Sequence, residues 1–214
     1  MRRPWRLVGV FLALVALTGW PLGQTSGLAQ SAINPAKVDA LDMTLRHLLV
    51  DHVFWVRSLA VAAKSGNAEA ADVAYRMALN NARDLGQAVA SFYGQPAGEK
   101  FSQLFTGHVN AVKSYWDAAA RGDEAGKRAA STQMTQNGDQ LATFLSSANP
   151  NLPKAAVLSL LQAHVAVHVG QCTAIVAGNW KEEAQTWDAM LKNVYSIADA
   201  LAQGIAKQFP SKFS

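Results

Sequence analysis

The hexapeptide LLVDHV at residues 48–53 occurs three times in this chain in related form. LFTGHV at 104–109 and LLQAHV at 160–165 align with it without gaps, and each copy begins 56 residues after the previous one. Two turn residues and one asparagine in each copy keep the same interval: Gly66, Gly122 and Gly178; Asn67, Asp123 and Asn179; Asn81, Asn137 and Asn193. One spacing held by four sets of residues predicts a structural unit that is repeated three times.

Each unit is expected to be a helical hairpin. Between Lys37 and Phe209, apolar residues recur three and four positions apart, which is typical of helices packed on one face. Turn residues interrupt this pattern at five places: Ser65–Asn67, Tyr93–Pro96, Arg121–Asp123, Ala148–Pro153 and Gly178–Asn179. Five breaks predict six helices. The sequence therefore predicts an all-α, closed six-helix bundle of three antiparallel hairpins, at about 38–93, 94–149 and 150–209.

The first 29 residues have the three parts of a secretory signal peptide. An arginine-rich start precedes the apolar run LVGVFLALVAL at 7–17, and Gly27 and Ala29 supply the small residues that a signal peptidase needs. Cleavage after Ala29 would leave residues 30–214 as one exported domain. The apolar run is shorter than the roughly 20 residues that span a bilayer, and no later stretch approaches that length. We therefore expect a secreted, periplasmic protein without stable membrane insertion.

Composition argues against several classes of function. Loss of the three signal-peptide arginines lowers the formal net charge from +4 to +1, and the remaining basic residues are scattered, so no nucleic-acid surface is predicted. The chain has no Ser-His-acid elbow, phosphate-binding glycine loop or Rossmann fingerprint. Its one cysteine, Cys172, is expected to be a small buried residue, with a redox-sensitive thiol as the alternative. We therefore expect a binding protein and not an enzyme.

One histidine in each copy falls on the core-facing stripe of the first helix, where an aliphatic residue is usual. These histidines are His52, His108 and His164. The same stripe of the second helix carries Asn81, Asn137 and Asn193. Counted from the hairpin turn, His52 and Asn81 are each fourteen residues away, so both lie roughly 21 Å from it at 1.5 Å per residue. Each histidine is therefore level with an asparagine that it can hydrogen-bond.

Two interpretations of these residues remain open. In the structural one, each His–Asn pair is an internal strut that fixes the register of its hairpin. In the metal-binding one, His52, His108 and His164 meet around a pseudo-threefold axis and hold one ion, with the asparagines as supporting partners or weak ligands. His168, four residues after His164 on the same helix face, is a candidate fourth ligand.

The residue types on the inward stripes restrict the metal. A di-iron carboxylate site needs inward glutamates, and the predicted stripes carry none. Imidazole ligands, joined by a thiolate if Cys172 one turn beyond His168 takes part, indicate zinc or copper.

A third hypothesis is a carrier of a small hydrophobic or anionic molecule, so the predicted partner is a metal ion or a small ligand. Aromatic residues could line an apolar cavity for such a ligand: the tryptophans Trp55, Trp116, Trp180 and Trp187, with Phe54, Tyr75, Tyr93 and Tyr115.

Four stretches, DHVFWVR at 51–57, FYG at 92–94, NGDQLATFL at 137–145 and GIAKQF at 204–209, resemble an uncharacterised family of bacterial all-helical proteins. The resemblance covers essentially the whole mature chain. It implies the helical fold and the repeat, and it implies no activity.

The resemblance also implies that the first copy is specialised. In that family an acidic residue often follows the repeated asparagine by three positions; Asp84 fits this pattern, whereas Gln140 and Ser196 do not. Asp51, Arg57 and Asp84 would then join the histidine and asparagine of the first copy, with Arg57 paired to Asp84 or to an anionic ligand.

Overall fold

The computed structural model describes residues 33–214, and the predicted signal peptide with its cleavage site lies outside this range. Helices make up almost all of the described chain: α1 (Pro35–Lys64), α2 (Ala68–Tyr93), α3 (Gln95–Ala120), α4 (Glu124–Ala148), α5 (Lys154–Ala177), α6 (Trp180–Gln208) and the short 3₁₀ helix η1 (Pro210–Lys212). Residues 33–214 contain no strand. The predicted all-α class is confirmed, and the five breaks fall where the turn residues placed them.

The three turns inside the hairpins are built alike. Gly66, Gly122 and Gly178 have positive φ angles of 74°, 68° and 71°, which residues with a Cβ rarely adopt. The residue after each glycine caps the next helix by accepting a hydrogen bond from a backbone N–H three residues further on, at 3.0, 2.8 and 3.3 Å; these residues are Asn67, Asp123 and Asn179. Local sequence therefore determines where these helices end and begin.

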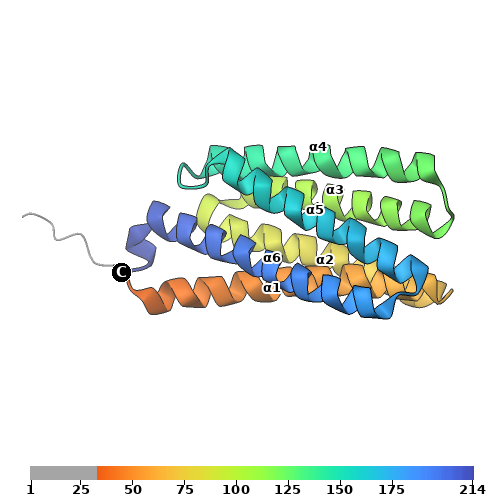
Figure 1. Cartoon of the computed structure of the whole chain (residues 1–214). Coiled ribbons are helices and arrows are strands. Elements are labelled where there is room, and N and C mark those ends of the chain that lie inside the picture. Colours follow the sequence, from red (N-terminus) through yellow and green to blue (C-terminus); the bar gives the residue numbers. More distant parts are fainter. Residues whose placement is uncertain (1–32) are drawn as a thin grey trace, which may run out of the picture. The chain divides into compact units, whose positions relative to one another are not determined.

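The six helices form a closed bundle (Figure 1). Each helix packs against its neighbours in the chain, and α6 also packs against α1, which closes the ring. The first helices of the hairpins, α1, α3 and α5, contact one another as well. They therefore meet inside the ring, and side chains on their inward faces lie at the centre of the molecule.

Two glycines let α2 and α3 approach closely where the first hairpin meets the second. A Cβ on Gly86 would lie 2.7 Å from the carbonyl oxygen of Gly98, and a Cβ on Gly98 would lie 2.5 Å from that of Gly86. Both separations are shorter than real Cβ contacts, so this crossing requires glycine on both helices.

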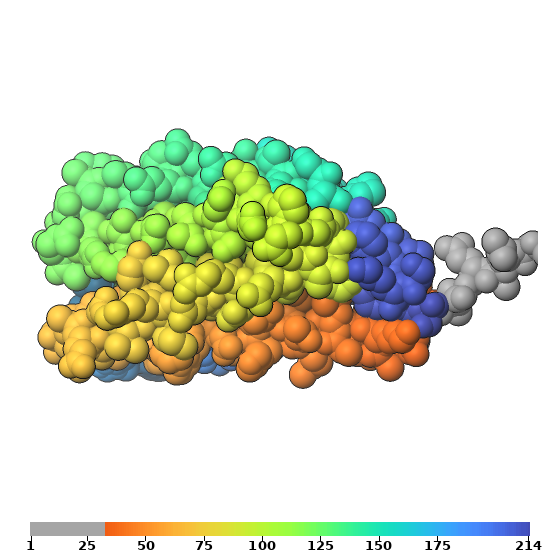
Figure 2. All heavy atoms as spheres, turned by 180° about the vertical axis from the view of Figure 1, so that it is seen from behind, coloured from red at the N-terminus to blue at the C-terminus, as the bar shows by residue number. Residues whose placement is uncertain are grey.

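The end of the bundle opposite the hairpin turns is closed by the C-terminal residues. The Asn34 backbone N–H donates to the Phe213 carbonyl at 2.6 Å, and Phe213 packs with Ile205 and Ala206. Figure 2 shows the C-terminal segment, in dark blue, beside the start of α1 and the junction of α2 with α3. The Tyr93 hydroxyl links the hairpins there, since it accepts a hydrogen bond from Asn149 at 2.9 Å and donates one to Gln208 at 2.9 Å.

Among the described helices, α5 alone is long and apolar enough to cross a membrane, although no stretch of that length was predicted after the signal peptide. Length and composition are weak evidence for a span, because a core helix has the same properties. Here α5 packs against α4, α6 and the inner helices, and its buried residues include two histidines and Gln171. Polar groups on the buried face are those expected of a helix that lines an internal site.

Candidate metal centre

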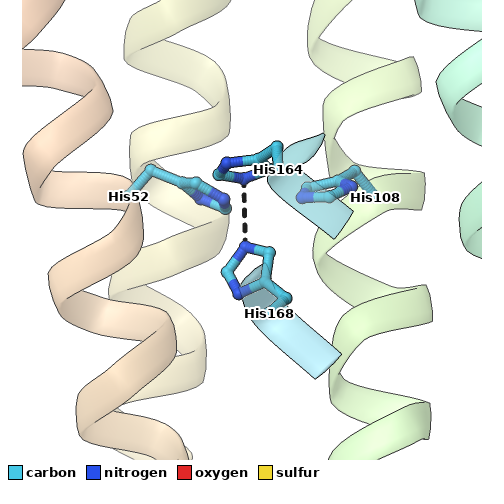
Figure 3. Close-up of side chains that lie close together, drawn as sticks. All are labelled: His52, His108, His164 and His168. Carbon is cyan, nitrogen blue, oxygen red and sulfur yellow. Dashed lines mark hydrogen bonds between the residues drawn. The ribbon is translucent and has the colours of Figure 1, made fainter. Parts of the chain in front are cut away.

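The fold brings four histidines together at the centre of the bundle. His52 lies on α1, His108 on α3, and both His164 and His168 on α5. At most 5% of each side chain is exposed. Each histidine offers one ring nitrogen such that the four atoms lie within 4.8 Å of one another. Figure 3 shows the four rings converging from the three inner helices.

The four rings are arranged more like a tetrahedron than a square. Five of the six ring-centroid separations lie between 5.4 and 5.9 Å, and the sixth, between His164 and His168, is 4.5 Å. In a square, two separations would exceed the other four by a factor of about 1.4. Metal–nitrogen bonds of about 2.0–2.1 Å in a tetrahedral site place the ligand atoms about 3.3–3.4 Å apart. A contraction of rather more than 1 Å at the widest pair would therefore complete such a site.

The hydrogen bonds of the third hairpin determine the tautomers of its two histidines. Asn193 donates through Nδ2 to the Leu160 carbonyl at 3.2 Å, which turns its Oδ1 toward His164 Nδ1 at 2.9 Å. Since Oδ1 only accepts, His164 carries its proton on Nδ1 and has a free lone pair on Nε2. His168 Nε2 lies 3.0 Å from that atom and donates to it. One proton thus occupies the place between two nitrogens that a metal ion would take.

The other two asparagines make only half of this arrangement. Asn81 and Asn137 donate to the carbonyls of Leu48 and Leu104 at 2.8 and 2.9 Å. Each of these hydrogen bonds joins residues 33 positions apart, as does the bond from Asn193 to Leu160. Within the described chain their Oδ1 atoms have no hydrogen-bond partner. The expected His–Asn hydrogen bond is therefore present in one hairpin out of three.

Several nitrogen atoms of the cluster are buried without a partner among residues 33–214. They are both ring nitrogens of His52, Nε2 of His108 and Nδ1 of His168. Buried polar atoms are normally hydrogen-bonded, and an unpaired one costs about 1–3 kcal/mol. Such a concentration at one place makes the cluster a candidate ligand site.

Burial lowers the pKa of all four histidines, because an imidazolium loses its hydration in the core. The pKa of His108 falls from 6.5 to about 3, and that of His164 to about 4, where the hydrogen bond with Asn193 partly opposes the effect of burial. The pKa values of His52 and His168 lie well below 6.5, from burial and then from the neighbouring histidines. All four imidazoles are therefore neutral at pH 7, as metal ligands must be.

Three residues expected beside the first histidine lie elsewhere. Asp51 contacts the exposed His47 at 3.4 Å, and Asp84 is exposed on α2. Arg57 does not pair with Asp84; its Nε and Nη2 donate to both carboxylate oxygens of Glu183 on α6, at 2.6 and 2.8 Å. A specialised first copy is therefore not found in the contacts of these three side chains.

Glu183 is a buried acidic residue that the predicted stripes missed. Its side chain is 4% exposed, and Gln171 donates to it at 3.1 Å. The paired Arg57 holds the pKa of Glu183 below its ordinary value. Glu183 lies in the first turn of α6, and its pairing with Arg57, 126 positions away, accounts for its burial.

Replacement of Arg57 by methionine is expected to destabilise the protein by about 2–3 kcal/mol, because Glu183 would stay buried without its partner. The expected loss of stability is smaller than for a fully buried ion pair, because the Arg57 side chain is 34% exposed. Chemical denaturation at pH 7 measures the change. Arg76→Met is the matched control: Arg76 pairs with Asp72 at 69% and 53% exposure, so a loss below about 0.5 kcal/mol is expected. Equal losses in both variants would contradict a special role for Glu183 burial.

Cys172 is not part of the histidine cluster, so the thiolate considered as an additional ligand is not among the candidate ligands. It is fully buried, and burial raises the pKa of its thiol to about 12. The predicted small buried residue is confirmed, and a redox-sensitive thiol has no support from this environment.

Two apolar cavities lie inside the bundle, and the four tryptophans line neither of them. Their walls are mainly leucine and phenylalanine. Of the aromatic residues expected to line a cavity, Tyr93 lines the smaller of the two. Trp116 lines a separate pocket between α1, α3 and α5. The larger apolar cavity has a volume of about 50 Å³ and adjoins three of the four histidines.

No family model, curated protein or solved structure matches this chain. The fold and the cluster define its class directly: an all-helical bundle with four buried histidines at its centre, close enough together to be a candidate metal site. The resemblance noted in the sequence adds nothing further to this description.

Proposed function

We propose that this protein is an exported metal-binding protein that holds one ion through His52, His108, His164 and His168. The observation that carries the proposal is the environment of His52. It is fully buried, both of its ring nitrogens lack a described hydrogen-bond partner, and three other imidazoles surround it. A strut would be hydrogen-bonded, and a packing residue would be apolar. The environment of His52 therefore favours a metal ligand, and a bond to an ion would satisfy one of these nitrogens.

The asparagines support the proposed ligands in the way that ligating histidines usually require. A metal-bound histidine commonly donates its other ring N–H to an oxygen atom, which fixes ring orientation. Asn193 already accepts from His164, and Asn81 and Asn137 hold unpartnered Oδ1 atoms at the equivalent sequence positions of their hairpins. We expect the same hydrogen bond from His52 and from His108 in the metal-bound protein.

The chemistry of the cluster favours a d¹⁰ ion, either zinc(II) or copper(I). Imidazole suits both metals, and neither ion has a geometric preference from its d electrons, so both accept a tetrahedral arrangement. Copper(II) prefers a square arrangement, which the ring separations do not approach. The cluster includes no described carboxylate to balance charge. Since the cost of burying an ion rises steeply with its charge, copper(I) has an advantage that zinc(II) must offset by stronger bonds.

Two further features of the proposal come from the sequence. The signal-peptide pattern at residues 1–29 supports export to the periplasm, where an ion could be taken up without passing a membrane. The 56-residue interval, together with the repeated 33-residue Asn–Leu hydrogen bonds, supports the derivation of the three hairpins from one ancestral unit. A threefold frame of this kind would place equivalent histidines at one centre.

Metal analysis of protein purified without an affinity tag tests the proposal. We expect one equivalent of zinc or copper per chain, and we expect the metal to raise the melting temperature of the chelator-treated protein. At a free-metal concentration of a hundred times Kd, the stabilisation is about 3 kcal/mol, which corresponds to roughly 5–10 °C for a domain of this size. Copper is tested as copper(I) under reducing, oxygen-free conditions.

Magnesium is the control for non-specific ion effects, because it prefers oxygen ligands and should leave the melting temperature unchanged. Substoichiometric zinc and copper after purification, with no thermal shift on addition of either ion, would contradict the proposal.

A further inference from the structure

The larger apolar cavity lies against one side of the histidine cluster. His52, His108 and His164 line it, whereas His168 is not among its described lining residues. Its other walls come from leucine, phenylalanine, valine, isoleucine and one glycine. Since the cavity includes Leu45 and Leu49 but no residue of α5 beyond Val165, it lies toward the beginning of α1 and α5. His168 lies one turn further along α5, on the opposite side of the other three imidazoles.

Gly138 on α4 is one reason for this cavity. A Cβ built on Gly138 would meet no described atom within 4 Å, although the residue is buried. The equivalent positions in the other two hairpins hold Ala82 and Val194, which are fully buried in the core. Interiors are normally close-packed, so the missing side chain leaves open space beside the cluster.

A second cavity continues from the first along the bundle. Its volume is about 40 Å³, and it shares Leu45, Phe101 and Leu201 with the larger one. Its far wall includes Phe92 and Tyr93 at the end of α2. The two cavities thus follow one another from the histidines toward the end of the bundle that the C-terminal residues cover.

Volume and lining restrict what can occupy the larger cavity. One water molecule needs about 10–15 Å³ of such volume, so about 50 Å³ admits a molecule of only a few heavy atoms. An ion would lose its hydration against apolar walls, and a polar molecule would find hydrogen-bond partners only on the histidines. The occupant that fits is small, uncharged and apolar.

We propose that this cavity binds a small uncharged molecule of diatomic size and presents it to the bound metal on the face formed by His52, His108 and His164. The cavity itself is independent of the metal, whereas the coordination step rests on the proposed function. In that step the bond from the metal to His168 Nε2 breaks as a bond to the lone pair of the incoming molecule forms, so the number of ligands and the oxidation state stay the same. Copper(I) binds such molecules and zinc(II) does not, so the cavity favours copper(I).

Xenon tests the cavity in the metal-free protein, because it occupies small apolar cavities without forming bonds. We expect xenon to shift the methyl NMR signals of residues that line the cavity, such as Leu49 and Leu141. Gly138→Val, which introduces the side chain found at Val194, should weaken xenon binding at least tenfold. Gly170→Ala is the matched control: its Cβ has ordinary contacts 3.8 Å from Thr186, and it lies outside the cavity, so xenon binding should persist. Absence of xenon-induced shifts in the wild type, or equal shifts in Gly138→Val, would overturn the cavity as a binding site.

Carbon monoxide tests the coordination step in the same three proteins loaded with copper(I). The copper content is measured first, so a failure of metal binding is recognised before any gas is added. We expect an infrared carbonyl band in the wild type and in Gly170→Ala, and its loss in Gly138→Val at an unchanged copper content. A copper-loaded wild type without a carbonyl band, or a band that survives in Gly138→Val, would overturn the presentation of the ligand from this cavity.

Discussion

Acidification from pH 7 to pH 5 is expected to destabilise the metal-free protein by about 8 kcal/mol, which approaches the whole stability of an ordinary domain. The four buried histidines have pKa values well below the 6.5 of an exposed imidazole. Below pH 6.5 the unfolded chain therefore binds protons that the folded chain does not, and stability falls with pH. At pH 5 this difference is about 2 kcal/mol for each histidine. Denaturant unfolding followed by circular dichroism in the presence of a chelator measures it.

The buried histidines and the buried carboxylate affect stability in different pH ranges. The pKa of Glu183 is lowered from 4.5, so the stability that its ion pair contributes is present above that pH and is lost only below it. His52→Leu should reduce the loss between pH 7 and pH 5 by about 2 kcal/mol, because one buried imidazole is removed. His47→Gln, at a side chain that is 77% exposed, is the control for removing a histidine outside the cluster. A stability that is constant from pH 7 to pH 5 would show that the cluster is not buried and neutral.

The parts of this structure that sequence could predict are those that depend on local rules. The helix boundaries could be predicted because they depend on a few neighbouring residues. These are the glycines with positive φ, Gly66, Gly122 and Gly178, and the capping residues that follow them. A constant interval between histidines places them at equivalent positions of three hairpins. From this the meeting of His52, His108 and His164 could be proposed as one of two alternatives, and the structure brings the rings within 6 Å of one another.

The remaining parts depend on contacts between distant residues, which spacing does not encode. Arg57 has acidic residues near it in sequence, yet its partner Glu183 lies 126 positions away. Each histidine lies at the same distance from the hairpin turn as its asparagine, so a hydrogen bond between them was possible. The rotation of each ring decides whether the bond forms, and only His164 makes one. The cavity beside Gly138 depends on the volumes of side chains from several helices, so no single stretch of sequence predicts it.

The residues that make the centre distinctive are departures from the threefold pattern. His168 occurs where the first two hairpins have Val56 and Val112, and both valines are buried. Gly138 occurs where the others have a larger residue. His168 and the cavity therefore come from different hairpins and lie on opposite sides of the three repeated imidazoles. An arrangement with exact threefold symmetry would have three equivalent histidines and neither of these features, so both set this centre apart from its own sequence repeat.

Replacement of His52 by leucine is expected to change metal affinity and apoprotein stability in opposite directions. Zinc or copper(I) affinity should fall about a thousandfold, since one of four ligands is lost and even supporting partners of ligands contribute 10–100-fold. The metal-free protein should become more stable at pH 7 by about 1–3 kcal/mol, because the change removes two buried nitrogens that lack described partners and orphans no other group. Competition with a chromogenic chelator measures the affinity, and denaturant unfolding measures the stability.

His164→Leu is the matched comparison, because it removes a ligand of the same type from an equivalent position. It should lose metal affinity to a similar extent, yet it should destabilise the metal-free protein, since Asn193 Oδ1 and His168 Nε2 would each lose a hydrogen-bond partner at 2.9 and 3.0 Å. Both variants should therefore lose metal affinity, while the stability of the metal-free protein changes in opposite directions. This combination is specific to a metal site in which only the histidines of the third hairpin are held by hydrogen bonds before the metal binds. If His52→Leu also destabilised the apoprotein and left metal binding intact, His52 would be a structural residue, and the four-histidine site would be wrong.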